Sequence, residues 1–137
     1  MRIMAIDYGD ARTGVAISDL TGSIVGTTLV VPSYNRERTL VQLKELVEQH
    51  GVTELVMGFP KNMDGSEGPR AALYREFAGL LQEATGLEPV LWDERRTTVD
   101  AHRILSDNNR HGKKRKATVD AVAASLILEV YLAFRRR

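Results

Sequence analysis

The fold of this chain is decided by its first stretch, Met1-Arg-Ile-Met-Ala-Ile-Asp7-Tyr-Gly9-Asp-Ala-Arg12-Thr-Gly14-Val-Ala-Ile-Ser-Asp19. The apolar run from Ile3 to Ile6 predicts a buried β-strand that ends on the carboxylate of Asp7. A second apolar run, from Val15 to Ile17, follows a short turn. The pattern therefore predicts a β-hairpin with a charged side chain where the first buried strand meets the turn.

Asp7 needs a partner, because an isolated carboxylate is costly to bury. That partner is a cation, a metal ion or backbone N–H groups, and Gly9 and Gly14 allow backbone or ligand to approach closely. The plainer alternative is that Asp7 only caps the turn, since Asp and Gly are ordinary turn residues. The spacing of the two glycines imitates a phosphate-binding loop, but Val15 and Ala16 stand where that loop needs Lys and Ser or Thr.

Length and composition indicate an ordinary globular protein. With 137 residues, we expect a single domain over residues 1–137. The absence of cysteine excludes disulfides, zinc–thiolate sites and thiol catalysis. The sequence has no apolar run near the roughly 20 residues that span a membrane, and it begins with a strand pattern rather than a signal peptide. We therefore expect a cytoplasmic protein with no membrane partner.

Positive charge is concentrated at the C-terminal end. The net charge is only +1, but residues 110–137 carry eight of the 19 Lys and Arg residues against two acidic ones. A basic cluster of this kind often contacts nucleic acid. The alternative is a solubilising loop followed by a basic tail that favours the dipole at a helix C-terminus. The cluster Lys113, Lys114, Arg115 and Lys116 is the better candidate for binding nucleic acid.

Further elements follow from periodicity and from Gly and Pro boundaries. Strands are expected at 23–31, 55–58 and 89–92, and helices at 36–50, 69–86, 97–106 and 118–134, with a mobile polar segment at 107–117. The apolar stripe of the second helix is predicted to be Leu73, Phe77, Leu80, Leu81 and Ala84. The order predicts an α/β fold: a five-stranded mixed sheet whose first three strands are antiparallel, with helices on both faces.

Acidic residues from remote parts of the chain are expected to meet at one edge of this sheet, where α/β proteins bind ligands. Asp7 ends the first strand, Asp93 and Glu94 end the fifth, and Asp120 opens the last helix on the same face as Ala124. Plainer roles are open to these residues. Asp93 or Glu94 could form a salt bridge with Arg95 or Arg96, and Asp120 could stabilise the helix dipole. Clustered carboxylates repel one another unless a cation is present. With no Cys and three scattered His, oxygen ligands favour Mg²⁺ or Mn²⁺.

Four motifs in order resemble the YqgF family, also called the RuvX or pre-16S rRNA nuclease family, of the RNase H-like superfamily. The resemblance covers essentially the whole chain. The motifs are Asp7-Tyr-Gly9 with Gly14-Val-Ala-x-Ser-Asp19, the loop Gly58-Phe-Pro60-x-Asn62-Met-Asp64-Gly65-Ser-Glu67-Gly68-Pro-Arg70, Asp93-Glu94-Arg95-x-Thr97-Thr98, and Asp120-Ala-Val-Ala123-Ala124-x-x-Ile127-Leu.

The resemblance implies an RNase H-like fold and metal-dependent hydrolysis of phosphodiester bonds. It carries the catalytic and metal-binding roles onto Asp7, Glu94 and Asp120, with Mg²⁺ or Mn²⁺ as cofactor. Arg70 and Arg95 are expected to orient a phosphate. Asn62 and Asp64 are reserve ligands of the metal, although Asp64 before Gly65 is more typical of a turn. One geometric difficulty is that the fifth strand lies two strand spacings, roughly 9–10 Å, from the first.

Three functions compete. The first is a nuclease for structured RNA, in 5′-end maturation of pre-16S rRNA, acting as a monomer or homodimer. The second is a Holliday junction resolvase, which needs two sites and therefore a dimer on branched DNA. The third is a ribosome-assembly factor that binds RNA without cleaving it. The Asp-Tyr-Gly turn also resembles that of sugar kinases and actin-like ATPases, but those proteins need two lobes.

Overall fold

The computed structural model describes residues 1–94 and 112–135, with side chains in the last helix described from residue 121 onward. Its elements are β1 (Arg2–Asp7), β2 (Arg12–Ser18), β3 (Val25–Pro32), α1 (Arg36–His50), β4 (Val52–Phe59), α2 (Pro69–Thr85), β5 (Val90–Asp93) and α4 (Gly112–Arg135). The predicted helix at 97–106 lies outside the described residues. None of the helices in the described ranges combines the length and apolar character needed to cross a bilayer.

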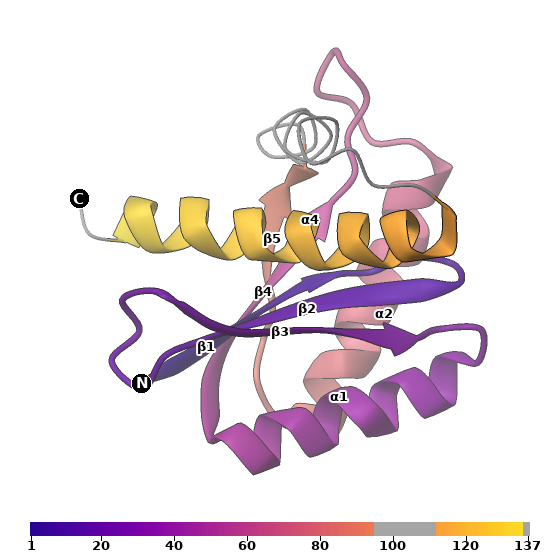
Figure 1. Cartoon of the computed structure of the whole chain (residues 1–137). Helices are drawn as coiled ribbons and strands as arrows, with labels where there is room; N and C mark the ends of the chain where they lie inside the picture. The colour runs from indigo at the N-terminus through magenta and orange to yellow at the C-terminus, as the bar shows by residue number, and fades with distance from the viewer. Residues whose placement is uncertain (95–111, 136–137) are drawn as a thin grey trace.

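The five strands form one mixed sheet in the order β3-β2-β1-β4-β5 (Figure 1). β1 pairs antiparallel with β2, and β2 pairs antiparallel with β3. β4 runs parallel to β1 on one side and to β5 on the other. The predicted meander and mixed sheet are confirmed, and so is the separation of β1 from β5 by one intervening strand.

Two apolar cores fill the space on the two faces of the sheet. Helices α1 and α2 cover one face with the core that contains Met4, Ile6 and Phe77. Helix α4 covers the other face with the core that contains Ile3, Ala5 and Ile127 (Figure 1). Because strand side chains alternate, the residues of β1 divide between the two cores, and helices on both faces are confirmed.

Local sequence signals account for the helix ends. The side chain of Asn35 accepts a hydrogen bond from the N–H of Arg38 and so caps α1. Gly51 ends that helix in the left-handed region, with φ 64°, where glycine is favoured. Pro69 occupies the first turn of α2, where its missing N–H costs nothing.

Several expectations were wrong in detail. β4 spans Val52–Phe59 rather than 55–58. β3 begins at Val25 rather than at residue 23. α4 begins at Gly112 rather than near 118, so the basic cluster 113–116 lies in a helix instead of a polar loop. In α2, Leu73 is 57% exposed, whereas Tyr74 is 4% exposed and joins the core. The buried stripe of α2 is Ala71, Tyr74, Phe77, Ala78 and Leu81.

Candidate active site

The site lies where the carboxyl ends of β1, β4 and β5 meet. Asp7 is the last residue of β1, and Glu94 follows the last residue of β5. Ile3 and Ala5 belong to the core under α4, so alternation along β1 places Asp7 on the face that α4 covers. Trp92 belongs to the same core, and Glu94, two residues later, continues that face.

The side chains of Asp7 and Glu94 are hydrogen-bonded to each other. Burial raises the pKa of Glu94, whereas the hydrogen bond to Asp7 and the charge of Arg70 lower it and the charge of Asp93 raises it. Two ionised carboxylates held so close repel each other unless a cation lies beside them. The pair is therefore suited to hold a cation.

Gly58 lies between the two carboxyls. The parallel register of β1 and β4 pairs Ile6 with Met57, so the next residues along the two strands, Asp7 and Gly58, are neighbours. On the other side of β4, Gly58 pairs with Trp92 of β5. A Cβ atom at Gly58 would stand 3.1 Å from Cγ and 3.2 Å from Oε1 of Glu94. Glu94 therefore crosses β4 over Gly58 to reach Asp7.

Arg70 is the cation that the described structure places beside this pair. It lies in the first turn of α2 and donates a hydrogen bond of 2.8 Å to the hydroxyl of Tyr74. That hydroxyl in turn donates to the backbone carbonyl of Tyr8 at 2.5 Å. The ring of Tyr8 stacks on Phe77 with 3.9 Å between centroids. Arg70 is thus tied to the residue that follows Asp7.

Gly9 and Ser33 shape the turn behind Asp7. A Cβ atom at Gly9 would stand 2.4 Å from the carbonyl oxygen of Arg12, so no side chain fits there. Ser33 Oγ donates to the carbonyl of Gly9 at 2.6 Å. Gly14 of β2 pairs with Asp7 across the hairpin. The close approach of backbone that the glycines predicted is present at Gly9.

The loop of the second motif, between β4 and α2, is held by hydrogen bonds among its own residues. Asp64 Oδ1 accepts hydrogen bonds from the N–H and the hydroxyl of Ser66, at 2.9 and 2.6 Å. Asn62 donates to Ser66 Oγ at 2.9 Å. Gly65 has φ 88°, as a tight turn requires. These contacts favour the turn role for Asp64 that its sequence context suggests.

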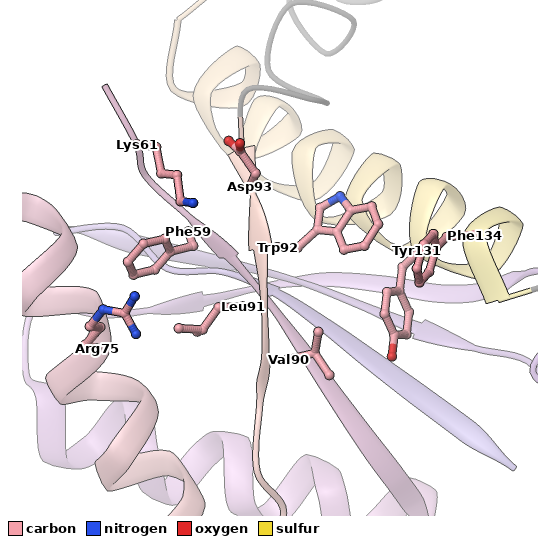
Figure 2. A pocket seen from close by; sticks show the side chains of 9 residues that line it. All are labelled: Phe59, Lys61, Arg75, Val90, Leu91, Trp92, Asp93, Tyr131 and Phe134. Atoms are coloured by element: carbon pink, nitrogen blue, oxygen red, sulfur yellow. The ribbon is translucent and has the colours of Figure 1, made fainter. Parts of the chain in front are cut away.

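A cavity of about 660 Å³ lies along β5. Figure 2 shows Lys61 and Asp93 at one end of it and Tyr131 and Phe134 of α4 to one side. Asp93 pairs with Phe59 and lines this cavity. Glu94, rather than Asp93, is therefore the β5 carboxyl that meets Asp7.

Several predicted site residues lie where the structure describes no side chain. Arg95 is outside the described residues. The structure describes only the backbone of α4, and no side chain, at Asp120 and at the cluster Lys113, Lys114, Arg115 and Lys116. Residue 120 precedes Ile127 by two turns of α4, and Ile127 Cδ1 would stand 3.0 Å from a Cβ atom at Gly58. Among the described residues, no group of three or more His, Asp or Glu could hold a metal ion.

Sequence reasoning did not predict that Tyr74 is buried beside the site. It also did not predict that Gly58 lies beneath the side chain of Glu94. The period of α2 would have found Tyr74 if Ala71 and Ala78 had been counted as core positions, because they share its face at i−3 and i+4. Gly58 carried no local signal, since a glycine at a strand end is also an ordinary boundary residue.

The sequence profile of the RuvX family, described as Holliday junction resolvase, matches residues 1–134. The chain belongs to this family. A relative from Halothermothrix orenii, named "Putative pre-16S rRNA nuclease", is 44% identical over 137 residues, covering 100% of this chain and 98% of the relative. One of the same name from Carboxydothermus hydrogenoformans is 39% identical over 137 residues, covering 100% and 99%.

Solved structures show the same fold at low identity. RuvC of Thermus thermophilus matches with a TM-score of 0.60 and 11% identity, covering 99% of this chain and 96% of RuvC. The Holliday junction resolvase of fowlpox virus matches with a TM-score of 0.58 and 12% identity, covering 100% of both. The RNase H-like fold is confirmed. Both the family and the named relatives are nucleases, hydrolases of phosphodiester bonds, so the predicted class of enzyme is confirmed.

Proposed function

We propose that this RuvX-family protein is a divalent-metal-dependent nuclease whose metal is held by Asp7, Glu94 and Asp120. The observation that carries the proposal is the hydrogen-bonded pair of Asp7 and Glu94 at the carboxyl edge of the sheet. Two carboxyls brought together from separate strands fit a hard divalent cation, because the cation replaces the repulsion between them with attraction. Asp120 is assigned from its motif and its place in α4.

The residues of the chain supply the rest of the site. Arg70 stands beside the acidic pair and is suited to hold a non-bridging phosphate oxygen by a charge-assisted hydrogen bond. Tyr74 keeps Arg70 in position and fixes the backbone after Asp7. When bound, Mg²⁺ or Mn²⁺ supplies a water of lowered pKa and stabilises charge at phosphorus. The basic cluster Lys113–Lys116 and Arg95 are the proposed contacts to the nucleic-acid backbone.

The proposed substrate is structured RNA at the 5′ end of the 16S rRNA precursor. Relatives at about 40% identity over the whole chain carry that activity in their name. Branched DNA is the second candidate, because the family description names a Holliday junction resolvase and solved resolvases share the fold. The two candidates use the same chemistry and differ in assembly, since junction resolution requires two sites in a dimer.

Cleavage by wild type and by Asp7→Asn tests the proposal directly. Each protein is incubated with a 16S rRNA precursor and with a four-way DNA junction, with Mg²⁺, with Mn²⁺ and with EDTA. We expect the wild type to cleave only with metal and Asp7→Asn to lose at least ~100-fold in rate, because the substitution removes a charged ligand of the metal. The substrate that is cleaved decides between the two candidates.

Asp19→Asn is the matched control. Asp19 belongs to the first motif and directly follows β2, where its carboxylate accepts from the N–H groups of Ser23 and Ile24 in a turn remote from Asp7. We expect it to cleave at the wild-type rate. Cleavage by Asp7→Asn at that rate would refute the assignment. No metal binding by the wild type, even with RNA present, would favour an assembly factor that does not cleave.

A further inference from the structure

Glu94 reaches the site by an unusual path. It follows β5, whereas Asp7 ends β1, and β4 lies between them. Two strand spacings are roughly 9–10 Å, yet the two side chains are hydrogen-bonded. The Glu94 side chain must therefore lie flat across β4, over whatever residue that strand presents on the same face.

That residue is Gly58. Its backbone does not require glycine, because it is not among the glycines with positive φ in the described residues. Its surroundings are tight: an added Cβ atom would stand 3.1 Å from Glu94 Cγ, 3.2 Å from Glu94 Oε1 and 3.0 Å from Ile127 Cδ1, so these side chains would have to move apart. Such distances are shorter than ordinary van der Waals contact. The space above Gly58 is therefore filled by Glu94 from one side and by α4 from the other.

We propose that Gly58 is a positioning residue for metal binding: its missing side chain forms the passage through which Glu94 crosses β4 to share a cation with Asp7. Ile127 closes that passage on the side of α4. An added methyl group would press first on Glu94 and Ile127 and so shift the Glu94 carboxyl relative to Asp7. The inference rests on the proposed function, because it takes Glu94 as a ligand of the metal.

The alternative is that Gly58 only lets α4 pack closely against the sheet. In that case Gly58→Ala would destabilise the fold through Ile127, and any loss of metal binding would follow from the loss of stability. The two explanations differ in whether the effect of Gly58→Ala depends on the presence of Glu94.

A double-mutant cycle with full-length protein separates them. Mn²⁺ affinity is measured by titration calorimetry, and thermal unfolding is followed without metal, for wild type, Gly58→Ala, Glu94→Ala and the double variant. We expect Gly58→Ala to lower Mn²⁺ affinity by about 10- to 100-fold, as loss of a ligand-orienting residue does. In the Glu94→Ala background we expect it to lower affinity by less than twofold, because no carboxyl remains to be displaced.

Gly79→Ala is the matched control, because a Cβ atom at this glycine of α2 meets nothing within 4 Å. We expect wild-type Mn²⁺ affinity and cleavage. If Gly58→Ala alone does not fold, the cycle is run in Ile127→Val, which lacks the Cδ1 atom at 3.0 Å. Affinity losses that multiply in the double variant, or wild-type affinity in Gly58→Ala, would overturn the inference and leave the proposed function standing. Wild-type affinity in Glu94→Ala would overturn both.

Discussion

Tyr74 shows how one hydroxyl can organise a charged edge. It accepts from Arg70 and donates to the carbonyl of Tyr8, while its ring meets Tyr8 edge-on, 5.4 Å between centroids. Burial raises the pKa of Tyr74 to about 12, and the charge of Glu94 also raises it. The folded protein therefore holds the phenol proton more tightly than the unfolded chain does.

Tyr74→Phe is expected to lower the free energy of unfolding by about 1–3 kcal/mol at neutral pH, because it leaves the carbonyl of Tyr8 without this donor. A raised pKa stabilises the fold fully below the ordinary value of 10.0, and this contribution is lost as pH rises toward about 12. Urea unfolding between these pH values should therefore show stability falling less steeply in Tyr74→Phe than in wild type.

Tyr131 also has a pKa raised to about 12, first by burial and then by its hydrogen bond to Glu54, so a smaller decline should persist in Tyr74→Phe. An unchanged slope in that variant would contradict the assignment. In cleavage assays the variant should show a raised KM more than a lowered kcat, because it loosens Arg70 rather than the metal ligands.

Helix α4 is anchored at its C-terminal end by a cluster on β4. Tyr131 donates to Glu54 Oε2 at 2.5 Å, and Arg135 Nη1 lies 2.6 Å from the same oxygen. The ring of Tyr131 meets Trp92 edge-on at 5.5 Å. Glu54 lies near the start of β4 and Gly58 near its end, so this anchor is remote from the acidic pair. Arg135, which belongs to the basic tail of the sequence, thus helps to hold α4 against β4.

Tyr131→Phe is expected to cost about 1–2 kcal/mol of stability through the lost hydrogen bond to a carboxylate. Arg135→Ala should cost less than about 1 kcal/mol, because the ion pair is partly exposed, with 35% and 27% of the two side chains accessible. Both variants should cleave at the wild-type rate. Denaturant unfolding measures both losses of stability. A larger loss in Arg135→Ala than in Tyr131→Phe would contradict this ranking.

The charge of the whole molecule is nearly balanced, at +1, so binding to a polyanion depends on where the positive groups lie. The cluster Lys113, Lys114, Arg115 and Lys116 falls in the first turns of α4, on the element that also carries Asp120 and Ile127.

Replacing the four basic residues by Ala is expected to weaken RNA binding and to reduce its dependence on salt. Each phosphate contact that is lost should reduce the slope of log affinity against log salt by about 0.7–0.9. Filter binding or fluorescence anisotropy from low to high salt measures the slope. Lys44→Ala on the exposed side of α1 should leave the slope within the error of wild type, and an unchanged slope in the fourfold variant would contradict the proposed contact.

The sequence alone determined the sheet and predicted one edge of it as the place of the site. The apolar run of β1, the glycine turn after it and the period of α1 are local patterns, and the structure has a buried strand, a turn and a helix at these places. The order of these elements then left little choice of topology, because a strand after a helix must pair in parallel. Asp7 could be placed at a carboxyl edge for that reason.

Only the tertiary structure decided how the site is assembled. The meeting of Glu94 with Asp7 depends on Gly58 and Ile127, which come from two other elements, and no local pattern records a contact among four segments. The inward face of α2 carries Tyr74 rather than Leu73, because Tyr74 and Phe77 of this helix both pack against Tyr8. Packing between remote segments fixes side-chain paths, and this information is not contained in the period of any one element.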